Sequence, residues 1–553
     1  MSFLQRNHRL IFYTAWIVLG LLQSALTSLL DDEAYYWVYS HYLDWGYYDH
    51  PPLIAVLVKA GYAIFPNELG VRLFPLILNV LTLLIIEKLL NKKNPWLFYA
   101  IALSIAFLQL AGFIAVPDTP LIFCTALFFL CYQKFTQRPD WVNIVLLGIP
   151  MALLLYSKYH AVLVILFTLL SDMRLFRKYQ LWVAGFIALL CFGPHLWWQY
   201  QHDWVSFKYH LFENNVTKYK VSYTTGYVLG QLLMAGPIAG IILVPAALLY
   251  RSENKTEKAL RYTLVGMYVF FLLSSFRGRV EPNWTSPLMV PLFVLSHQYL
   301  AEKTRWQTLL YKLLPVTLIL VLFARIVMIK DILPVTAIQQ RFHHWKDWPA
   351  EMKERTRGLP VVFSNSYQRA SQYWFNTGQM AYSQNLYRGR RNNFNFWPVE
   401  DSLLGKPVYY VDNFGMNRFP DSLKTSFGWL GYRYDSAFLS LAKINIDPAE
   451  KKIFLKEDDS ITITATTSMP AHYHDFISRR PGQAVKLVVA FFDKQGWLKD
   501  DEKPISLGQL LQNPFQFAVR PGLPKGKYDM QLGLAVSDYF PTQNSAKIRL
   551  VVE

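Results

Sequence analysis

The chain has 553 residues, of which 53% are hydrophobic and only 17% are charged. Soluble proteins usually carry about 25% charged residues, so this composition excludes an ordinary soluble globular protein. The net charge is +17, but much of the surplus lysine and arginine lies in short loops between apolar runs, where such residues orient membrane helices. We therefore expect no nucleic-acid partner. The three cysteines all lie in apolar runs, and their spacing fits no metal site.

Apolar runs alternate with short polar loops up to about residue 330. A membrane helix needs roughly 20 apolar residues, and about eleven runs reach or approach this length. They lie at roughly 10–30, 71–90, 95–115, 119–133, 141–156, 159–171, 181–199, 226–250, 260–276, 286–300 and 307–329. The first run is too long for a signal peptide and lacks a small-residue cleavage site, so we predict an uncleaved first membrane helix. The shorter run 53–65 contains Lys59 and fits an interfacial or re-entrant helix.

The basic residues of the loops predict the orientation of the chain. If eleven spans are threaded in order, Arg6 and Arg9 lie on the same side as five further basic loops. These loops carry Lys92/Lys93, Lys134/Arg138, Arg174/Arg177/Lys178, Arg251/Lys255/Lys258/Arg261 and Lys303/Arg305. The positive-inside rule then places the N-terminus in the cytoplasm of an inner (plasma) membrane protein. The C-terminal part is expected on the periplasmic or extracellular face.

The loops on the opposite side carry acids, histidines and bases from distant parts of the sequence. They contain Asp31-Asp32-Glu33, Asp49-His50, Asp118, Lys158 with His160, His202-Asp203-Trp204 with Lys208, and Arg277 to Trp284. Ionisable residues are expensive near hydrocarbon, and scattered surface loops would place them on both sides. Their convergence on one face predicts an active site at the outer membrane boundary.

The sequence after Asp331 is mixed in composition and predicts soluble structure. Strands are expected at 360–363 and 408–411, with a helix at 367–375 between them. From about residue 450 apolar and polar residues alternate, as at 461–464 and 485–489, up to a last strand at 548–552, which is typical of a β-sandwich. We therefore predict a membrane domain over 1–330, a soluble α/β domain over 331–445 and a β-sandwich-like domain over 446–553.

An ordered set of short motifs resembles a known superfamily. The set consists of Asp32-Glu33-Ala34-Tyr35-Tyr36-Trp37, Tyr48-Asp49-His50-Pro51-Pro52-Leu53, Pro117-Asp118-Thr119-Pro120-Leu121, Ser157-Lys158-Tyr159, the stretch from Pro194 to Phe207 and Glu281-Pro282-Asn283-Trp284. Two further motifs, Ser366-Tyr367-Gln368 and Gly389-Arg390-Arg391, lie in the soluble part. Together they resemble the GT-C fold membrane glycosyltransferases, which include the protein O-mannosyltransferases and the bacterial lipid A aminoarabinose transferases.

This resemblance implies a polytopic α-helical membrane protein with a GT-C-like fold and a soluble C-terminal α/β plus β-sandwich part. It implies an inverting glycosyltransferase of the cell envelope whose donor is a polyprenyl-phosphate sugar, with undecaprenyl phosphate as the carrier in bacteria. The acceptor would be a hydroxyl or phosphate of lipid A, of a glycan or of a protein. The expected partners are this donor, one of these acceptors and the membrane lipids.

The match to the superfamily's Asp-Glu motif makes Asp32 the expected general base, because a carboxylate beside an attacking hydroxyl can take its proton. Asp31 is a rival, since neighbouring helical residues point about 100° apart and only one of them can face the site. Glu33 is also assigned to the catalytic group, either positioning the substrate or capping the following helix. Asp118 is a second catalytic carboxylate that orients acceptor or sugar, or else an N-cap.

Three cations are candidates for the lipid phosphate, because fixed positive charge stabilises a developing phosphate. They are Lys158, Arg279 and His50, and Arg277 competes with Arg279 for the same role. Some relatives carry lysine near the position of His50. The histidine leaves three roles open, namely a phosphate ligand, a metal ligand and a hydrogen-bond donor.

Four more residues complete the expected substrate- or lipid-phosphate-binding set: Tyr35, His202, Glu281 and Asn283. Two of them have other readings, since Tyr35 also fits an interfacial aromatic belt and Glu281 an ion pair with Arg279. No cofactor is expected to be required. A divalent metal is an open alternative, with ligands from Asp32, Glu33, His50, Asp118, His202 and Glu281, although none of them shows a tight ligand spacing.

Two other classes of protein compete with this reading. A transporter or flippase of a lipid-linked sugar would share many spans, but we see no inverted repeats of the kind that such proteins show. A non-catalytic scaffold for envelope assembly would leave the one-sided acidic and basic motifs unexplained.

Overall fold

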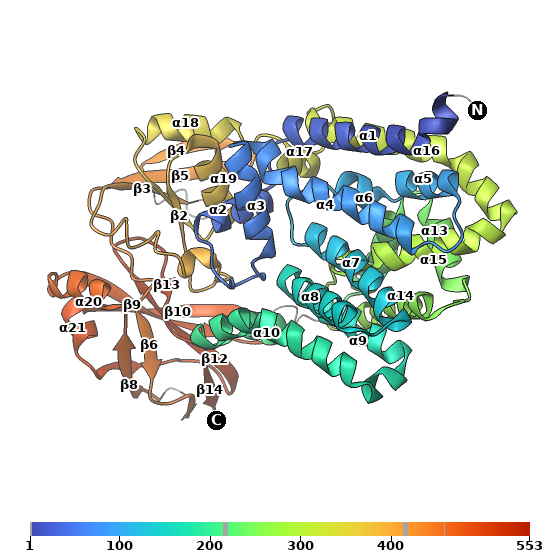
Figure 1. The fold of residues 1–553 in the computed structure, drawn as a ribbon. Coiled ribbons are helices and arrows are strands. Elements are labelled where there is room, and N and C mark those ends of the chain that lie inside the picture. The colour runs from blue at the N-terminus through green and yellow to red at the C-terminus, as the bar shows by residue number, and fades with distance from the viewer. Residues whose placement is uncertain (1–2, 214–218, 413–418, 458) are drawn as a thin grey trace. The chain divides into compact units, whose positions relative to one another are not determined.

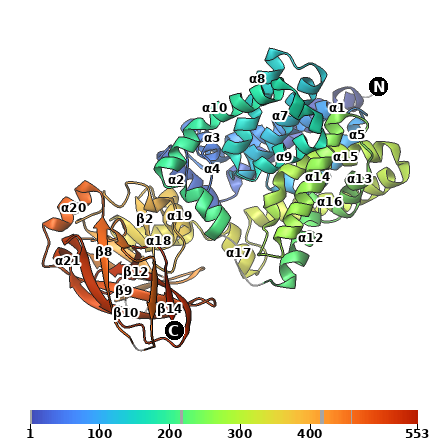
Figure 2. The same ribbon diagram turned by 90° about the horizontal axis from the view of Figure 1, so that it is seen from below.

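The structure is a computed structural model that describes residues 3–213, 219–412, 419–457 and 459–553. The contacts between residues divide it into two compact units, Met1–His343 and His344–Glu553. The first unit is helical and the second is built mainly of strands, as Figures 1 and 2 show. Each unit is described by itself below.

Most helices of the first unit follow the predicted apolar runs in chain order. The helices are α1 (Phe3–Leu26), α2 (Asp31–His41), α3 (Leu53–Ile64), α4 (Glu68–Leu89), α5 (Pro95–Ser104), α6 (Ala106–Leu110), α7 (Asp118–Gln137), α8 (Trp141–Ser157), α9 (Ala161–Ser171), α10 (Tyr179–Gln201), α11 (Val205–Lys208), α12 (Val221–Ala235), α13 (Gly240–Leu249), α14 (Lys255–Ser274), α15 (Met289–Glu302), α16 (Thr304–Ile329) and α17 (Thr336–Phe342). Several of them begin where a polar side chain accepts from a backbone N–H of the first turn, which stabilises a helix start. Asn67, Asn94, Asp140 and Asn254 cap α4, α5, α8 and α14 in this way.

Among the described residues, four helices are long and apolar enough to cross a membrane. They are Arg6–Leu26, Glu68–Leu89, Tyr179–Gln201 and Thr304–Ile329, and the pair α12 and α13, bent by 95°, makes a fifth if it counts as one broken span. Large apolar side chains on these helices, such as Leu10, Leu190 and Ile319, are exposed, which suits a surface that faces lipid. The unit is thus a polytopic helical membrane protein. The count of about eleven spans stays a prediction, because the other predicted runs form shorter helices.

Two predicted runs are interrupted where backbones pack closely. The run 226–250 breaks at Gly236, whose φ of 135° is one that side chains rarely adopt. A Cβ at Gly236 would lie 2.4 Å from the carbonyl oxygen of Ser104, at the end of α5. The run 95–115 breaks at Ile105, the residue that separates α5 from α6. Apolar composition alone does not reveal such tertiary contacts.

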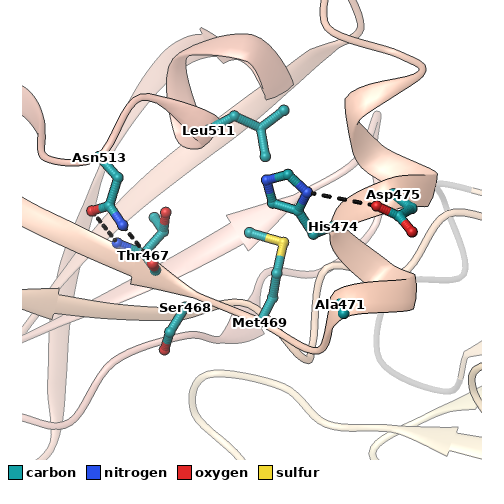
Figure 3. Close-up of a pocket in the computed structure, with 8 residues that line it drawn as sticks. All are labelled: Thr467, Ser468, Met469, Ala471, His474, Asp475, Leu511 and Asn513. Carbon is teal, nitrogen blue, oxygen red and sulfur yellow. Dashed lines mark hydrogen bonds and ion pairs between the residues drawn. The ribbon is translucent and has the colours of Figure 1, made fainter.

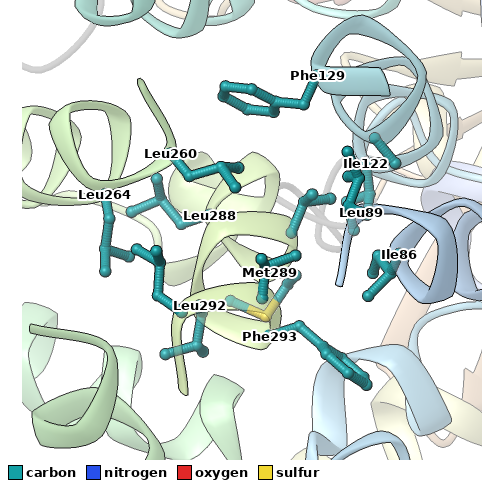
Figure 4. Close-up of a cluster of buried hydrophobic side chains, with 14 of the residues drawn as sticks. Ile86, Leu89, Ile122, Phe129, Leu260, Leu264, Leu288, Met289, Leu292 and Phe293 are labelled. Atoms are coloured by element: carbon teal, nitrogen blue, oxygen red, sulfur yellow. The ribbon is translucent and has the colours of Figure 1, made fainter. Parts of the chain in front are cut away.

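The core of the helical unit is centred on α15, where every residue from Met289 to Gln298 is buried. Figure 4 shows side chains of this segment among those of α4, α7 and α14. The residues labelled there are Ile86, Leu89, Ile122, Phe129, Leu260, Leu264, Leu288, Met289, Leu292 and Phe293. The residues from Met289 to Leu295 are all apolar, which is typical of a helix in the interior of a bundle. The short 3₁₀ helix η3 (Pro282–Leu288) leads directly into α15, so the core fixes its position.

The second unit begins with helix α18 (Asp347–Arg355) and a mixed five-stranded sheet of order β2-β1-β3-β5-β4. Its strands are β1 (Val361–Ser364), β2 (Ala381–Gln384), β3 (Val408–Asp412), β4 (Asp421–Thr425) and β5 (Gly428–Asp435). Strand β1 runs parallel to both β2 and β3, and helix α19 (Tyr367–Thr377) connects β1 to β2. The predicted strand–helix–strand pattern at 360–375 and 408–411 is confirmed.

The rest of the unit is a β-sandwich, as the alternating pattern predicts. One sheet has the order β10-β9-β12-β14-β7 with β13 on β12, and the other has the order β11-β8-β6. The strands are β6 (Asn445–Pro448), β7 (Lys452–Leu455), β8 (Ile461–Ser468), β9 (Ala484–Phe492), β10 (Trp497–Ser506), β11 (Phe515–Val519), β12 (Gly526–Ala535), β13 (Thr542–Gln543) and β14 (Ile548–Val552). Inward side chains such as Leu487, Leu532 and Ile463 form its core.

A cavity of about 410 Å³ opens at one end of the sandwich. It lies between the end of β8, helix α20 (Ala471–Ser478) and helix α21 (Leu507–Leu511), and Figure 3 shows its lining. Asn513 closes one side by bonding the backbone of Thr467, and the imidazole of His474 lies 4.0 Å from the carboxylate of Asp475. None of these residues belongs to the sequence motifs.

Candidate active site

The acidic turn at the start of α2 is anchored by a fully buried ion pair between Glu33 and Arg72. Arg72, from α4, donates Nε to one carboxylate oxygen over 2.7 Å and a terminal nitrogen to the other over 2.5 Å. Its remaining N–H groups bond the carbonyl oxygens of Ser24, Thr27 and Ser28. Every donor of the guanidinium is used, and such full pairing is what makes a buried charge tolerable.

Glu33 also joins the first two acidic motifs. Its carboxylate accepts from the backbone N–H of Leu30 at 2.9 Å, which caps α2, and from that of Ala115 at 2.8 Å. The second bond holds the turn that carries Asp32 against the loop that leads into Asp118. This geometry is that of a side chain that positions its neighbours, and the predicted catalytic role of Glu33 itself stays a prediction.

Asp118 is the centre of a buried polar cluster drawn from three segments. It receives the Lys158 ammonium at 2.9 Å and the Ser286 hydroxyl at 2.7 Å on one oxygen, and the Asn283 amide at 3.0 Å on the other. Lys158 lies in the break between α8 and α9, and Asn283 and Ser286 lie on η3. Asp118 is the first residue of α7 rather than its N-cap, which is Pro117. Its carboxylate therefore serves these partners instead of capping.

Histidines surround this cluster. The Nδ1 atoms of His50 and His160 are buried and have no hydrogen-bond partner among the described residues. The rings of His50 and His210 lie 6.4 Å apart, and that of His160 lies 5.2 Å from the ring of Trp284. Burial, followed by the charge of Lys158, holds the pKa of His50 well below its ordinary 6.5 and lowers the pKa of His210 to about 4. These imidazoles are neutral at neutral pH, and a bound anion would favour their protonation.

Asp49 connects the His50 loop to α2. Its carboxylate accepts from the hydroxyls of Tyr35 at 3.2 Å and Tyr39 at 3.4 Å, and its carbonyl oxygen bonds Nε2 of His210 at 2.8 Å. Tyr35 is buried, so it belongs to the interior rather than to an exposed aromatic belt.

The two candidate bases differ in their surroundings. Asp31 forms an ion pair with Arg341 of α17 at 2.9 Å, and the Arg341 side chain is 48% exposed. Asp32 is partly exposed and lies in the first turn of α2, directly before Glu33. Asp31 thus has a basic partner, and the assignment of Asp32 as the base stays a prediction.

Three predicted ligands lie outside the Asp118 cluster. His202 stacks on Trp198 with ring centroids 4.0 Å apart, and its Nδ1 bonds the Trp198 carbonyl oxygen at 2.9 Å. Arg279 pairs with Glu281 at 2.9 Å, and their side chains are 70% and 44% exposed. This is the alternative ion pair that the sequence left open. Exposed pairs of this kind contribute about 0–1 kcal/mol.

Some residues of the site were not predicted. Arg72 carries a readable signal, because a charge near the start of a long apolar helix needs a partner. Ser286 carries no signal of its own, since a serine after a proline-rich turn is ordinary. His210 lies in the predicted outer loop 200–225, but nothing local points to its contact with Asp49. Within the described ranges, no group of three or more His, Cys, Asp or Glu side chains is arranged to hold a metal ion.

Comparisons with known proteins agree with this picture. Residues 49–198 match the family described as dolichyl-phosphate-mannose-protein mannosyltransferase. The lipid A galacturonosyltransferase RgtD of Rhizobium johnstonii is 23% identical over 300 residues, which cover 51% of this chain and 63% of that protein. An uncharacterized protein of Aquifex aeolicus is 34% identical over 99 residues, which cover 17% of this chain and 20% of that protein. The chain thus spans less than two thirds of the length of either relative.

Two solved structures share the fold. ArnT from Cupriavidus metallidurans bound to undecaprenyl phosphate superposes with a TM-score of 0.55 at 13% identity, covering 78% of this chain and 98% of that one. Its apo state gives 0.57 at 12% identity, covering 77% and 98%. The fold is that of a polytopic helical membrane protein with a C-terminal β-rich part. The predicted resemblance to the GT-C membrane glycosyltransferases is confirmed.

Proposed function

We propose that this protein transfers a sugar from a polyprenyl-phosphate donor, undecaprenyl phosphate in bacteria, to an acceptor at the non-cytoplasmic membrane boundary. The observation that carries the proposal is the buried cluster of Asp118, Lys158, Asn283 and Ser286 beside three histidines. A structure of the same fold binds undecaprenyl phosphate, and a relative is named as a lipid A transferase. These names support the donor class and make a lipid A-like glycolipid the best-supported acceptor.

The reaction is a single displacement with inversion. The acceptor oxygen attacks the anomeric carbon while the bond from that carbon to the phosphate oxygen breaks. The proton of the acceptor passes to the carboxylate of Asp32, a step worth roughly 10²–10⁴-fold. The electron pair of the broken bond leaves on the polyprenyl phosphate.

Cations near Asp118 stabilise that leaving phosphate. An ammonium group has three donors, and Lys158 gives one of them to Asp118 at 2.9 Å, so two remain for phosphate oxygens. His50 and His210 add donors, and they gain charge when an anion binds. Asp118 holds Lys158 in place, because an unpaired ammonium at this depth would be costly. Nothing in the geometry favours a transporter or a scaffold.

Release of polyprenyl phosphate tests this proposal. The purified full-length protein is incubated with lipid A and with undecaprenyl-phosphate-linked hexoses, pentoses or hexuronic acids, and the lipid products are followed by mass spectrometry. We expect at least one donor to be cleaved and its sugar to appear on the acceptor. A transporter would move the lipid across a vesicle without cleaving it, and an intact donor in every reaction contradicts the proposal.

Two Asp→Asn substitutions at helix starts provide a matched pair. Asp118→Asn removes the charge that holds Lys158, and loss of such a preorganised group costs about 10²-fold or more in rate. Asp140→Asn changes the N-cap of α8, where asparagine caps equally well, so turnover should stay unchanged. Ser286→Ala removes only one bond to Asp118 and gives an intermediate loss if Asp118→Asn folds poorly. Equal rates for Asp118→Asn and wild type would refute the role of the cluster.

A further inference from the structure

The second unit contains another group of polar residues, at the carboxyl ends of its parallel strands. The chain leaves the central strand β1, passes through α19 to β2 on one side and later forms β3 on the other side. In open parallel sheets, the crevice outside the carboxyl ends at such a reversal of strand order is a preferred ligand site. Two motifs that the catalytic scheme does not use, Ser366-Tyr367-Gln368 and Gly389-Arg390-Arg391, belong to this edge.

The turn between β1 and α19 has a fixed and unusual shape. Asn365 has a φ of 42°, in the left-handed region that asparagine tolerates best after glycine. Its backbone N–H bonds the carbonyl oxygen of Gln384 at 2.7 Å, which joins the end of β1 to that of β2. Ser366 caps α19 by accepting from the N–H of Arg369. The start of this eleven-residue helix is thereby held at the strand ends.

Near this edge, several buried side-chain oxygens have no hydrogen-bond partner among the described residues. Asn385 is 2% exposed, and Ser371 and Ser383 are fully buried. Their side-chain oxygens, with Oδ1 of Asn365, accept or donate no hydrogen bond within the described part of the chain. Ser383 and Asn385 alternate onto one face of β2, and α19, which carries Ser371, packs beside β2 (Figure 2). Each unpaired group costs about 1–3 kcal/mol, so a cluster of them indicates a place where a polar ligand pairs with them.

The Gly389 turn reaches the same edge. A Cβ at Gly389 would lie 2.2 Å from Nδ2 of Asn365, so a larger residue here would require the Asn365 side chain to move. The preceding Arg388 is bound by Asp500 at 2.9 Å and stacks on Trp497. Arg369, in the first turn of α19, is half-buried, and the acid that acts on it electrostatically is Asp412 at the end of β3. A guanidinium and a helix start therefore lie together, and both favour anions.

We propose that this strand-end site, formed by Asn365, Arg369, Asn385, Gly389 and the start of α19, binds an anionic sugar unit of the acceptor. The guanidinium and the helix start take its phosphate or carboxylate, and the amide oxygens of Asn365 and Asn385 accept from its hydroxyls. The identity of the ligand as acceptor rests on the proposed function. The binding itself does not, because it requires no donor and no turnover.

The test uses glucosamine 1-phosphate as the probe, with inorganic phosphate and glucosamine as its two halves. Binding to the full-length protein in detergent is measured by calorimetry without any donor. We expect the sugar phosphate to bind at least tenfold more tightly than either half, and Arg369→Gln to weaken it at least tenfold. Arg479→Gln, which removes an exposed arginine at the end of α20, should leave the affinity unchanged.

A second readout covers the case in which Arg369→Gln folds poorly. Hydrogen exchange of wild type should slow over 364–372 and 385–391 when the probe is added. In turnover, Arg369→Gln should raise KM for the acceptor and leave KM for the donor unchanged. No binding, equal binding of phosphate alone, or an unaffected affinity in Arg369→Gln would overturn the site. If the protein binds the probe here but releases no polyprenyl phosphate, the proposed function fails and the site stands.

Discussion

Arg72 and Glu33 form a fully buried pair in which all five guanidinium donors and both carboxylate oxygens are bonded. The pair ties α4 to the end of α1 and, through the N–H of Ala115, to the loop before Asp118. Within the described chain, the pair makes no hydrogen bond to Asp118, Lys158, Asn283 or Ser286. We therefore expect the pair to position the two acidic loops relative to each other.

Arg72→Met is expected to destabilise the protein by about 3–5 kcal/mol, because it leaves the Glu33 carboxylate buried and uncompensated. The apparent melting temperature in detergent measures the loss. Adding Glu33→Gln to this variant removes the stranded charge, so the double variant should melt above Arg72→Met alone. A double variant that melts lower than Arg72→Met would show that the charge pair is not the source of the loss.

Substitutions of Asp32 and Asp31 test which of the two carboxylates is the general base. Asp32→Asn is expected to lower turnover by roughly 10²–10⁴-fold, because it removes the proton acceptor. Asp31→Asn breaks an exposed pair with Arg341, worth up to about 1 kcal/mol, and should keep most of the activity. Release of polyprenyl phosphate measures both. Normal transfer by Asp32→Asn, or a comparable loss in Asp31→Asn, would move the base assignment away from Asp32.

Much of the fold could be predicted because its signals are local. The apolar runs predict the helices of the first unit, and the alternating runs at 461–464 and 485–489 predict strands of the sandwich. The break at Gly236 could not be predicted, because it involves a close approach to the Ser104 carbonyl, far away in the sequence, and the break at Ile105 has no local sequence signal. The number of spans is equally hard to predict, since short helices share one apolar run.

The candidate site could be predicted only where a motif carries its own chemistry. Asp118, Lys158 and Asn283 lie in such motifs, and the structure brings them together. Ser286 lies 168 residues from Asp118 in sequence, and nothing in a single chain links the two. Arg279 and Glu281 pair with each other at the surface, which is the alternative that the sequence left open, and their predicted binding roles stay predictions.

Donor binding should strengthen as the pH falls from 7 towards 5. The pKa of His50 lies well below 6.5 and that of His210 is about 4 in the free protein, so both are neutral at pH 7. A bound phosphate raises these pKa values, so binding takes up protons and the affinity rises at lower pH, by at most tenfold per pH unit for each proton. A polyprenyl-phosphate sugar is a phosphodiester, which does not titrate in this range.

His50→Lys and His50→Gln check the source of this dependence. His50→Lys has a more basic side chain, which is charged over more of this pH range once the phosphate is bound, so it should bind the donor at pH 7 with a flatter pH profile. His50→Gln should bind weakly at both ends of the range. The affinity for a non-cleaved donor analogue is measured by calorimetry between pH 5 and 8, and a wild-type slope in His50→Gln would exclude His50 as the titrating group.

Glu400 and Asp401 are neighbours in the second unit, but the environments of their carboxylates differ. Glu400 is fully buried, and neither of its carboxylate oxygens accepts a hydrogen bond of ordinary geometry from the described residues, although Ser440 and Tyr382 lie beside it. Asp401 pairs with Lys443 at 2.7 Å and with His472 at 3.1 Å. Burial raises the pKa of Glu400 above its ordinary value.

This raised pKa means that the folded state binds a proton more tightly than the unfolded chain, whose glutamates titrate near pH 4.3. The contribution of Glu400 to stability is therefore complete below about pH 4.3 and is lost as the pH rises through the folded pKa. Glu400→Gln should melt above wild type at pH 8 and level with it at pH 4, because glutamine is never charged. Asp401→Asn should instead melt lower than wild type at pH 8, since Lys443 loses its partner. If Glu400→Gln melts below wild type at pH 8, then the carboxylate is stabilised in the folded unit and the sign of its pKa shift is wrong.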